Sequence, residues 1–142
     1  MSFAYLDHNA GTGLAEGVLD MMLPYLKQQQ GNPSSSHRFG RYTLAAIDHA
    51  RQQVANLVNV ETDQIIFTSG GTESNNQAIS GVAQKYDSGR VLIGSTEHPA
   101  VLEPAKRLQQ QGFEVLFIPV NADGLINVEI FETLLTDDTR LV

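Results

Sequence analysis

The sequence contains no cysteine, which excludes disulfide bonds and thiolate metal sites and is compatible with a reducing compartment. It also has no run of ~20 apolar residues and no basic stretch leading into an apolar one at its start. We therefore expect no membrane association and a cytoplasmic location. Positive charge is scarce, because 9 basic side chains face 16 acidic ones and leave a net charge of −7. Such a chain repels a phosphate backbone, so nucleic acid is not an expected partner.

What is present is the composition of a folded domain. The 142 residues are enough for one compact domain, or part of one, with a hydrophobic core. Hydrophobic residues make up 42% and charged residues 18%, close to the globular average.

The first part of the chain is predicted to be helical. After an irregular start over residues 1–14, apolar residues recur at helical spacing over 15–29 and again over 38–58. A loop rich in Gly, Pro and Ser separates them at 31–36. We expect two helices, of which the second is long and amphipathic.

The remainder alternates strand and helix patterns. The β-prone run 64–68 predicts a buried strand, and a tight turn then leads into a helix over 73–86. The cycle repeats as a strand over 90–94, a helix over 99–111 and a strand over 113–120. This alternation predicts an α/β fold with a mainly parallel sheet flanked by helices.

The end of the chain holds one more helix and the start of a strand. Asn127 can cap a short helix whose apolar residues are expected to point inward, namely Ile130, Phe131, Leu134 and Leu135. The last three residues, 140–142, have the pattern of a buried strand that has only begun. A natural C-terminus rarely falls there, so we expect a truncated part of a longer protein.

The turn at 69–72 is the first candidate site. It would direct the first amides of a helix into the crevice at the carboxyl end of a strand, where Gly70 and Gly71 allow close approach. Such amides lack intrahelical partners and bind phosphate, and the Thr72 hydroxyl can add to them. Equally compatible is a turn without ligand, in which Thr72 is the N-cap and Glu73 satisfies the helix dipole. Nucleotide-binding glycine motifs are not matched.

His98 is the second candidate. It precedes Pro99, which suits the first position of a helix, and would stand at the same sheet edge as the turn. An imidazole there could stack on a planar cofactor or exchange protons, although a single histidine before a helix is more often a cap. His8, His37 and His98 lack the local spacing of a metal site, so none is expected. His49 falls on a polar helix face and is expected in solvent.

Several stretches together resemble the cysteine desulfurase branch of the class V aminotransferases. In the family's order they are Tyr5 to Ala10, Gly31 to Ser35, His37 to Gly40, Ile66 to Asn76, and Thr96 to His98. The resemblance extends over the whole chain and matches roughly the first third of the family. It implies the N-terminal part of a pyridoxal-phosphate-dependent transferase of fold type I. Residues 1–14 would be an arm near the substrate pocket, and 15–142 a partial cofactor-binding domain that ends before the Schiff-base lysine.

The resemblance also implies roles for individual residues. The phosphate of pyridoxal 5′-phosphate would be bound at Gly70, Gly71 and Thr72. His98 would stack on the cofactor ring and act catalytically. The substrate pocket would be lined by Asn9, Ala10, Asn32 and His37.

The activity implied is conversion of L-cysteine to L-alanine by a homodimer. Sulfur would pass to an acceptor protein for iron–sulfur cluster assembly or thio-modification. The family's lysine, its acidic partner of the pyridinium nitrogen and its cysteine are not matched, and Lys27, Lys85 and Lys106 are no substitutes, so this chain alone is expected to be inactive.

One departure leaves alternatives open. Gly11, Thr12 and Gly13 stand where the family commonly has Thr-Thr-Pro, which makes the substrate class less secure. A selenocysteine lyase or an aminotransferase of the same class therefore stays open. So does a free-standing, non-catalytic module.

Overall fold

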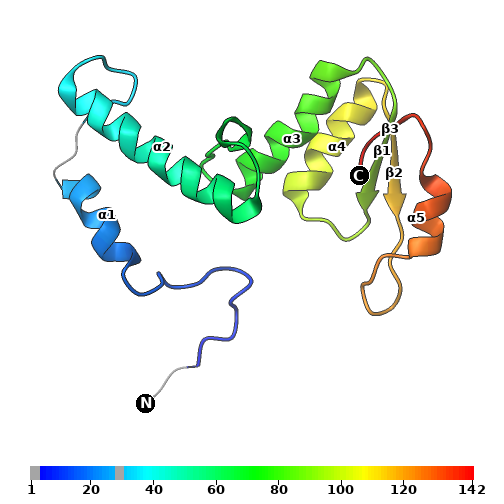
Figure 1. The fold of residues 1–142 in the computed structure, drawn as a ribbon. Coiled ribbons are helices and arrows are strands. Elements are labelled where there is room, and N and C mark those ends of the chain that lie inside the picture. The colour runs from blue at the N-terminus through cyan, green and yellow to red at the C-terminus, as the bar shows by residue number, and fades with distance from the viewer. Residues whose placement is uncertain (1–3, 28–30) are drawn as a thin grey trace. The chain divides into compact units, whose positions relative to one another are not determined.

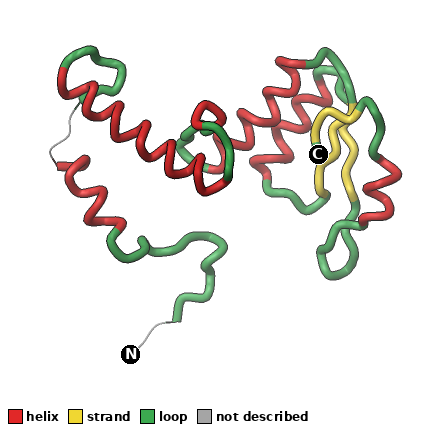
Figure 2. The backbone as a smooth tube through the Cα atoms, viewed as in Figure 1, coloured by secondary structure: helices red, strands yellow, loops and turns green. Residues whose placement is uncertain are grey.

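The computed structural model describes residues 4–27 and 31–142, which divide into two compact units, unit 1 up to residue 66 and unit 2 from residue 67 onward (Figure 1). Unit 1 contains α1 (Val18–Lys27), α2 (Arg38–Val58) and the short 3₁₀ helix η1 (Thr62–Gln64). Unit 2 contains α3 (Gly71–Lys85), β1 (Arg90–Gly94), α4 (Pro99–Gln110), β2 (Glu114–Ile118), α5 (Val128–Leu134) and β3 (Thr139–Leu141). All strands of the described chain lie in unit 2 (Figure 2).

The helix α2 has the bounds that the sequence predicts. At its start the His37 side chain accepts a hydrogen bond from the Gly40 amide over 3.3 Å, which satisfies one of the free amides of the first turn. At its end Asn59 adopts the left-handed conformation, with φ of 57°, and donates its amide to Ala55. The other helix, α1, begins three residues later than predicted, and the end predicted for it lies at residues outside the described part.

The Gly-Pro-Ser loop packs tightly against the start of α2. A Cβ atom on Gly31 would lie 2.2 Å from the Phe39 carbonyl oxygen, and one on Gly40 would lie 2.3 Å from the Ser35 carbonyl oxygen. Asn32 closes the loop, because its carbonyl accepts the Ser35 amide over 2.9 Å. The two glycines therefore allow two backbone segments to approach each other where any side chain would separate them.

Unit 1 buries little apolar surface. Among its described residues only Gly40 and Ala55 are buried, and both lie on α2. Large apolar side chains remain in solvent, with Met21 74% and Leu57 84% exposed. The amphipathic stripes predicted for these helices are present, but no core covers them within residues 4–27 and 31–66.

Unit 2 is built on a parallel sheet in the strand order β2-β1-β3. Val91 of β1 pairs with Val115 of β2, and Arg90 pairs with Thr139 of β3. The helices α3 and α4 lie next to each other on one side of the sheet, and α5 lies on the other (Figure 1). The core cluster between them consists of Ile79, Val82, Val91, Ile93, Ala105, Leu108, Phe113 and Val115. The predicted α/β fold with a parallel sheet and flanking helices is confirmed.

The strand predicted over 64–68 is wrong. Gln64 ends the helix η1, and no strand of the described chain pairs with the following residues. Ile66 and Phe67, predicted to be buried, are 64% and 49% exposed. A strand satisfies its amides and carbonyls only through a neighbouring strand, so a β-prone run without such a neighbour stays irregular.

The last elements follow the prediction in part. Asn127 caps α5, accepting the Ile130 amide over 3.0 Å, and β3 forms where the final strand was predicted. The expected inward face of α5 is present only in part: Phe131 and Leu134 are half-buried, whereas Ile130 and Leu135 are 39% and 41% exposed and the helix has no fully buried residue. Its seven residues pack against β2, and the Leu134 carbonyl accepts a hydrogen bond from Arg90 of β1 over 2.8 Å, which is too little contact to bury a full stripe. No helix within 4–27 and 31–142 is long and apolar enough to cross a bilayer.

Candidate cofactor-binding site

The turn that precedes α3 presents free amides. The N-cap is Gly70, whose carbonyl accepts the Ser74 amide over 3.1 Å in the first bond of the helix. The reading in which Thr72 is the N-cap is therefore wrong, since Thr72 is already the second residue of α3. Within the described part of the chain, the amides of Gly71, Thr72 and Glu73 have no acceptor. They lie at the positive end of the helix dipole.

The space around this turn is open. A Cβ atom on Gly70 or Gly71 would meet no atom within 4 Å, so the packing of the described chain does not itself require glycine at either position. Thr72 is exposed, and its hydroxyl has no hydrogen-bond partner among the described residues. An anion can therefore reach these groups without displacing protein atoms.

Glu73 bends back over the turn. Its Oε2 atom accepts one hydrogen bond from the Ser69 hydroxyl and one from the Ser69 amide, each over 2.6 Å. These two bonds, the hydroxyl bond foremost, hold the pKa of the Glu73 carboxyl below its usual value, although slight desolvation opposes them. The carboxylate thus stays ionised at neutral pH beside the free amides.

His98 begins α4 and caps it. Its Nδ1 atom accepts the Ala100 amide over 3.0 Å, and Pro99 occupies the first helical position. The capping role that competes with a catalytic one is thus present in the structure. The ring is exposed, so capping leaves part of it accessible.

Thr72 and His98 line one cavity. It measures about 310 Å³ and lies between α3 and α4, with Asn76, Glu103 and Arg107 among its other lining residues. The structure therefore brings together the two candidates that the sequence places in separate motifs. Gly70 and Gly71 precede Thr72 directly but are not among the residues that line the cavity.

Three polar lining residues were missed by the sequence reasoning, namely Asn76, Glu103 and Arg107. Asn76 donates its side-chain amide to the Thr72 carbonyl over 2.8 Å and so stiffens the first turn of α3. Arg107 adds a positive charge to the cavity wall. It follows Pro99 and Glu103 at intervals of four residues, which places all three on one face of α4. That spacing was visible in the sequence and could have identified it.

The four candidate substrate-pocket residues all belong to unit 1. Ala10 donates its amide to the Asp7 carbonyl over 3.1 Å in the turn that contains Asn9. The Asn32 side chain accepts the Ser34 amide over 2.9 Å, and His37 caps α2. Each contact shapes the local backbone, and the substrate role of these four residues stays a prediction.

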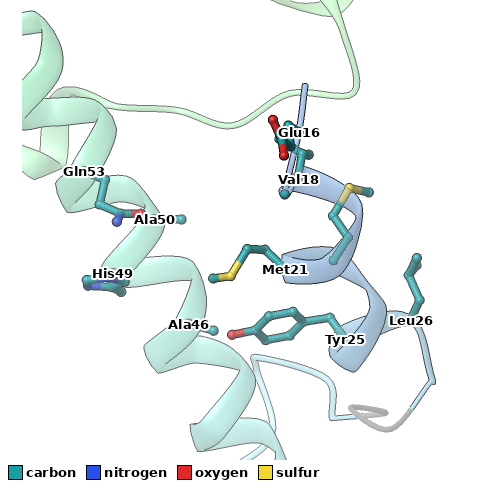
Figure 3. A pocket seen from close by; sticks show the side chains of 11 residues that line it. Glu16, Val18, Met21, Tyr25, Leu26, Ala46, His49, Ala50 and Gln53 are labelled. Atoms are coloured by element: carbon teal, nitrogen blue, oxygen red, sulfur yellow. The ribbon is translucent and has the colours of Figure 1, made fainter. Parts of the chain in front are cut away.

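A second cavity lies within unit 1, between α1 and α2 (Figure 3). It measures about 670 Å³, and its lining is mostly apolar. Met21 and Tyr25 extend from α1 toward Ala46 and Ala50, whose small side chains leave the space open (Figure 3). His49, predicted to be in solvent, is exposed at its wall. Among the described residues, no cluster of three His, Asp or Glu side chains could hold a metal ion.

Comparison with known proteins connects this geometry to a family. The sequence model of the aminotransferase class-V family matches residues 4–142. A cysteine desulfurase IscS from Dictyoglomus turgidum is 46% identical over 140 residues, which cover 97% of this chain and 36% of the relative. The chain thus spans little more than a third of that relative's length.

Solved structures agree in fold. A protein described as NifS-like superposes with a TM-score of 0.87 at 35% identity, covering 94% of this chain and 37% of that one. A structure of SspA in complex with cysteine gives a TM-score of 0.86 at 36% identity, covering 95% of this chain and 40% of that one. Both units thus have counterparts in known structures. The chain therefore belongs to the class-V aminotransferase family.

Proposed function

We propose that this chain is the phosphate-anchoring part of a pyridoxal-phosphate-dependent cysteine desulfurase. The activity would convert L-cysteine to L-alanine and pass sulfur to an acceptor protein for iron–sulfur cluster assembly or thio-modification. Relatives that carry this name support the proposal, as does a neighbour whose structure is a complex with cysteine. The observation that carries it is the cavity shared by Thr72 and His98, next to the free amides of α3.

The residues present fit the phosphate of such a cofactor. A phosphate dianion needs donors without competing acceptors, and the amides of Gly71 and Thr72 meet this requirement within the described chain. The Thr72 hydroxyl is exposed and can donate as well. Arg107 adds a positive charge to the same cavity, while two carboxylates oppose an anion, that of Glu103 in the cavity lining and that of Glu73 at the turn.

Each residue then has a definite task. Gly71 and Thr72 bind the phosphate and so fix the position of the cofactor. His98, held at the start of α4 by its bond to the Ala100 amide, would contact the bound cofactor from the cavity wall. Bound pyridoxal phosphate would supply an electron sink for bond cleavage at the amino acid.

The proposal extends to the organisation of the protein. Residues 1–14 would form an arm near the substrate pocket, and 15–142 would be a partial cofactor-binding domain. The substrate pocket would be lined by Asn9, Ala10, Asn32 and His37. The working protein would be a cytoplasmic homodimer that meets both L-cysteine and the sulfur acceptor.

Cofactor binding is tested by titration with a matched ligand. Pyridoxal 5′-phosphate and pyridoxal are added in parallel to the isotope-labelled chain while amide resonances are followed. We expect the phosphorylated ligand alone to shift Gly71 and Thr72. Thr72→Ala should weaken binding about fivefold, since one hydroxyl donor is lost, and Thr72→Ser should retain it. Equal shifts with pyridoxal would contradict a phosphate site at α3.

The activity is tested in a chimera. This chain replaces the matching segment of the D. turgidum desulfurase, and sulfide release from L-cysteine is measured in the presence of a reductant. We expect sulfide release that depends on Thr72 and His98. Activity toward L-selenocysteine alone, or amino transfer without sulfide, would instead assign a selenocysteine lyase or an aminotransferase.

A further inference from the structure

Glu73 makes the shortest pair of contacts in the candidate site. One carboxylate oxygen, Oε2, receives both the amide and the hydroxyl of Ser69 over 2.6 Å. Ser69 and Glu73 are four positions apart, so their hydrogen bonds close a turn that contains Gly70, Gly71 and Thr72. These bonds therefore tie the end of the incoming segment to the first turn of α3.

A second pair of side chains holds the same turn from its other end. The hydroxyls of Thr68 and Ser74 lie 2.6 Å apart, and each is within hydrogen-bond distance of the Gly70 carbonyl, at 3.2 Å and 3.3 Å. The Ser74 amide donates to the same carbonyl over 3.1 Å. The Gly70 peptide is thus fixed through its oxygen, while its neighbour Ser69 is fixed through its nitrogen.

These contacts leave a specific set of donors unused. The amide of Ser69 is bonded to Glu73, whereas the amides of Gly71 and Thr72 find no acceptor in the described chain. Donors that already point outward lose less freedom when a ligand arrives, so binding is stronger than in a loose turn of the same composition. A glycine pair without such support would sample many conformations.

The negative charge of Glu73 should by itself oppose the binding of a phosphate at the turn. A carboxylate beside a phosphate repels it, so Glu73 acting as a charge alone would weaken anion binding. A carboxylate that orders the turn would strengthen binding in spite of this repulsion. The two effects have opposite signs, and substitutions can separate them.

We propose that Glu73 is a positioning residue, which holds Ser69 and Gly70 so that the Gly71 and Thr72 amides are set for a phosphate. This inference rests on the proposed function, because it requires that a phosphate binds at α3. It assigns Glu73 no contact with the ligand itself. The clasp is defined as the two hydrogen bonds from Ser69 to Glu73.

The test compares Glu73→Ala with Glu73→Gln. Glutamine keeps a side-chain oxygen that can accept from Ser69 but removes the charge, whereas alanine removes both. Affinity for pyridoxamine 5′-phosphate is measured by titrating the amide resonances of the chain, with inorganic phosphate as a second probe. We expect Glu73→Ala to weaken binding about tenfold, and Glu73→Gln to bind within about threefold of the unmodified chain.

A ligand-free measurement accompanies the titration. Hydrogen exchange at the Ser69 amide should quicken in Glu73→Ala and remain slow in Glu73→Gln. Glu129→Ala is the matched control, because Glu129 also lies in the first turn of a helix, α5, yet has no side-chain hydrogen bond among the described residues. This control should leave both affinity and Ser69 exchange unchanged, and circular dichroism verifies that each variant is folded.

The outcomes separate the two proposals. If the unmodified chain binds pyridoxamine 5′-phosphate at Gly71 and Thr72 but Glu73→Ala binds as tightly or more tightly, Glu73 is only a repelling charge and the positioning role is overturned. If Glu73→Gln loses as much affinity as Glu73→Ala, the oxygen acceptor is not what matters and the role is likewise overturned. If the unmodified chain binds neither probe, the proposed phosphate site is wrong, and the positioning role, which requires that site, is wrong as well.

Discussion

The two units of this chain form regular structure under different conditions. Unit 1 contains the 21-residue helix α2 yet buries only Gly40 and Ala55 among its described residues. Unit 2 holds its sheet and its helices around a cluster of eight buried apolar residues. Helices satisfy their backbone hydrogen bonds within themselves, whereas strands need neighbours and a covered face. The comparison teaches that a long helix forms in unit 1 with little burial, whereas the strands of unit 2 pair around a buried cluster.

The largest expected effect on the free energy of unfolding comes from truncating a buried side chain in the core of unit 2. Leu108 is 2% exposed and belongs to the central cluster, so Leu108→Ala should destabilise the chain by about 3 kcal/mol through lost burial and a cavity. Leu57 of unit 1 is 84% exposed, and Leu57→Ala should stay within about 0.5 kcal/mol. Urea unfolding followed by circular dichroism measures both. Similar losses for the two variants would break the comparison between the units.

A second variant examines the one tightly packed place in unit 1. In Gly40→Ala the new methyl group would stand 2.3 Å from the Ser35 carbonyl oxygen and 2.6 Å from that of Asn32. The loop must then move away, at a cost of about 2 kcal/mol. Amide resonances of residues 31–41 should shift, while those of β1 keep their positions. Shifts that spread into unit 2 would show that the two units are coupled.

Gly81 serves as the counterpart of Gly40, because a side chain at position 81 would enter free space. It lies inside α3, and a Cβ atom there would meet nothing within 4 Å. Gly81→Ala should therefore stabilise the chain by about 1 kcal/mol, because alanine loses less backbone freedom in a helix. Thermal unfolding provides the measurement. A lower melting temperature for Gly81→Ala would mean that α3 needs this glycine for another reason.

The smallest effect is a pH dependence of the turn before α3. Since the bonds from Ser69 lower the Glu73 pKa in the folded chain, the clasp has its full strength at neutral pH and weakens only as the pH falls through that lowered value. A carboxyl-carbon titration should place the midpoint below the ordinary glutamate value. Ser69→Ala removes the hydroxyl donor and should raise the midpoint back toward it. An unchanged midpoint in Ser69→Ala would show that the hydroxyl bond does not cause the shift.

Much of the fold was predictable because its signals are local. The bounds of α2 and β1 follow from helical spacing and from a short buried run between turn residues, and both agree with the structure. The run 64–68 carries an equally clear local signal and still does not form a strand. No strand of the described chain lies beside it, and strand pairing depends on residues distant in sequence that no local pattern reveals.

The candidate site was predictable in its parts but not in its connections. Thr72 and His98 could be named from their motifs and were expected at one sheet edge. The structure brings them to one cavity although no strand of the described chain precedes Thr72. The Glu73 clasp was missed because a standard capping box joins residues three apart, whereas Ser69 and Glu73 are four apart. A search for Ser four residues before Glu across a glycine turn would have found it.

The cap that His98 places on α4 also determines where its proton sits. A ring nitrogen that accepts an amide hydrogen bears none of its own, so a neutral His98 carries its hydrogen on Nε2. A molecule in the neighbouring cavity then meets an N–H donor, and it can draw on the lone pair of Nδ1 only by releasing the Ala100 amide. The start of α4 thus selects one tautomer of the ring before any ligand arrives.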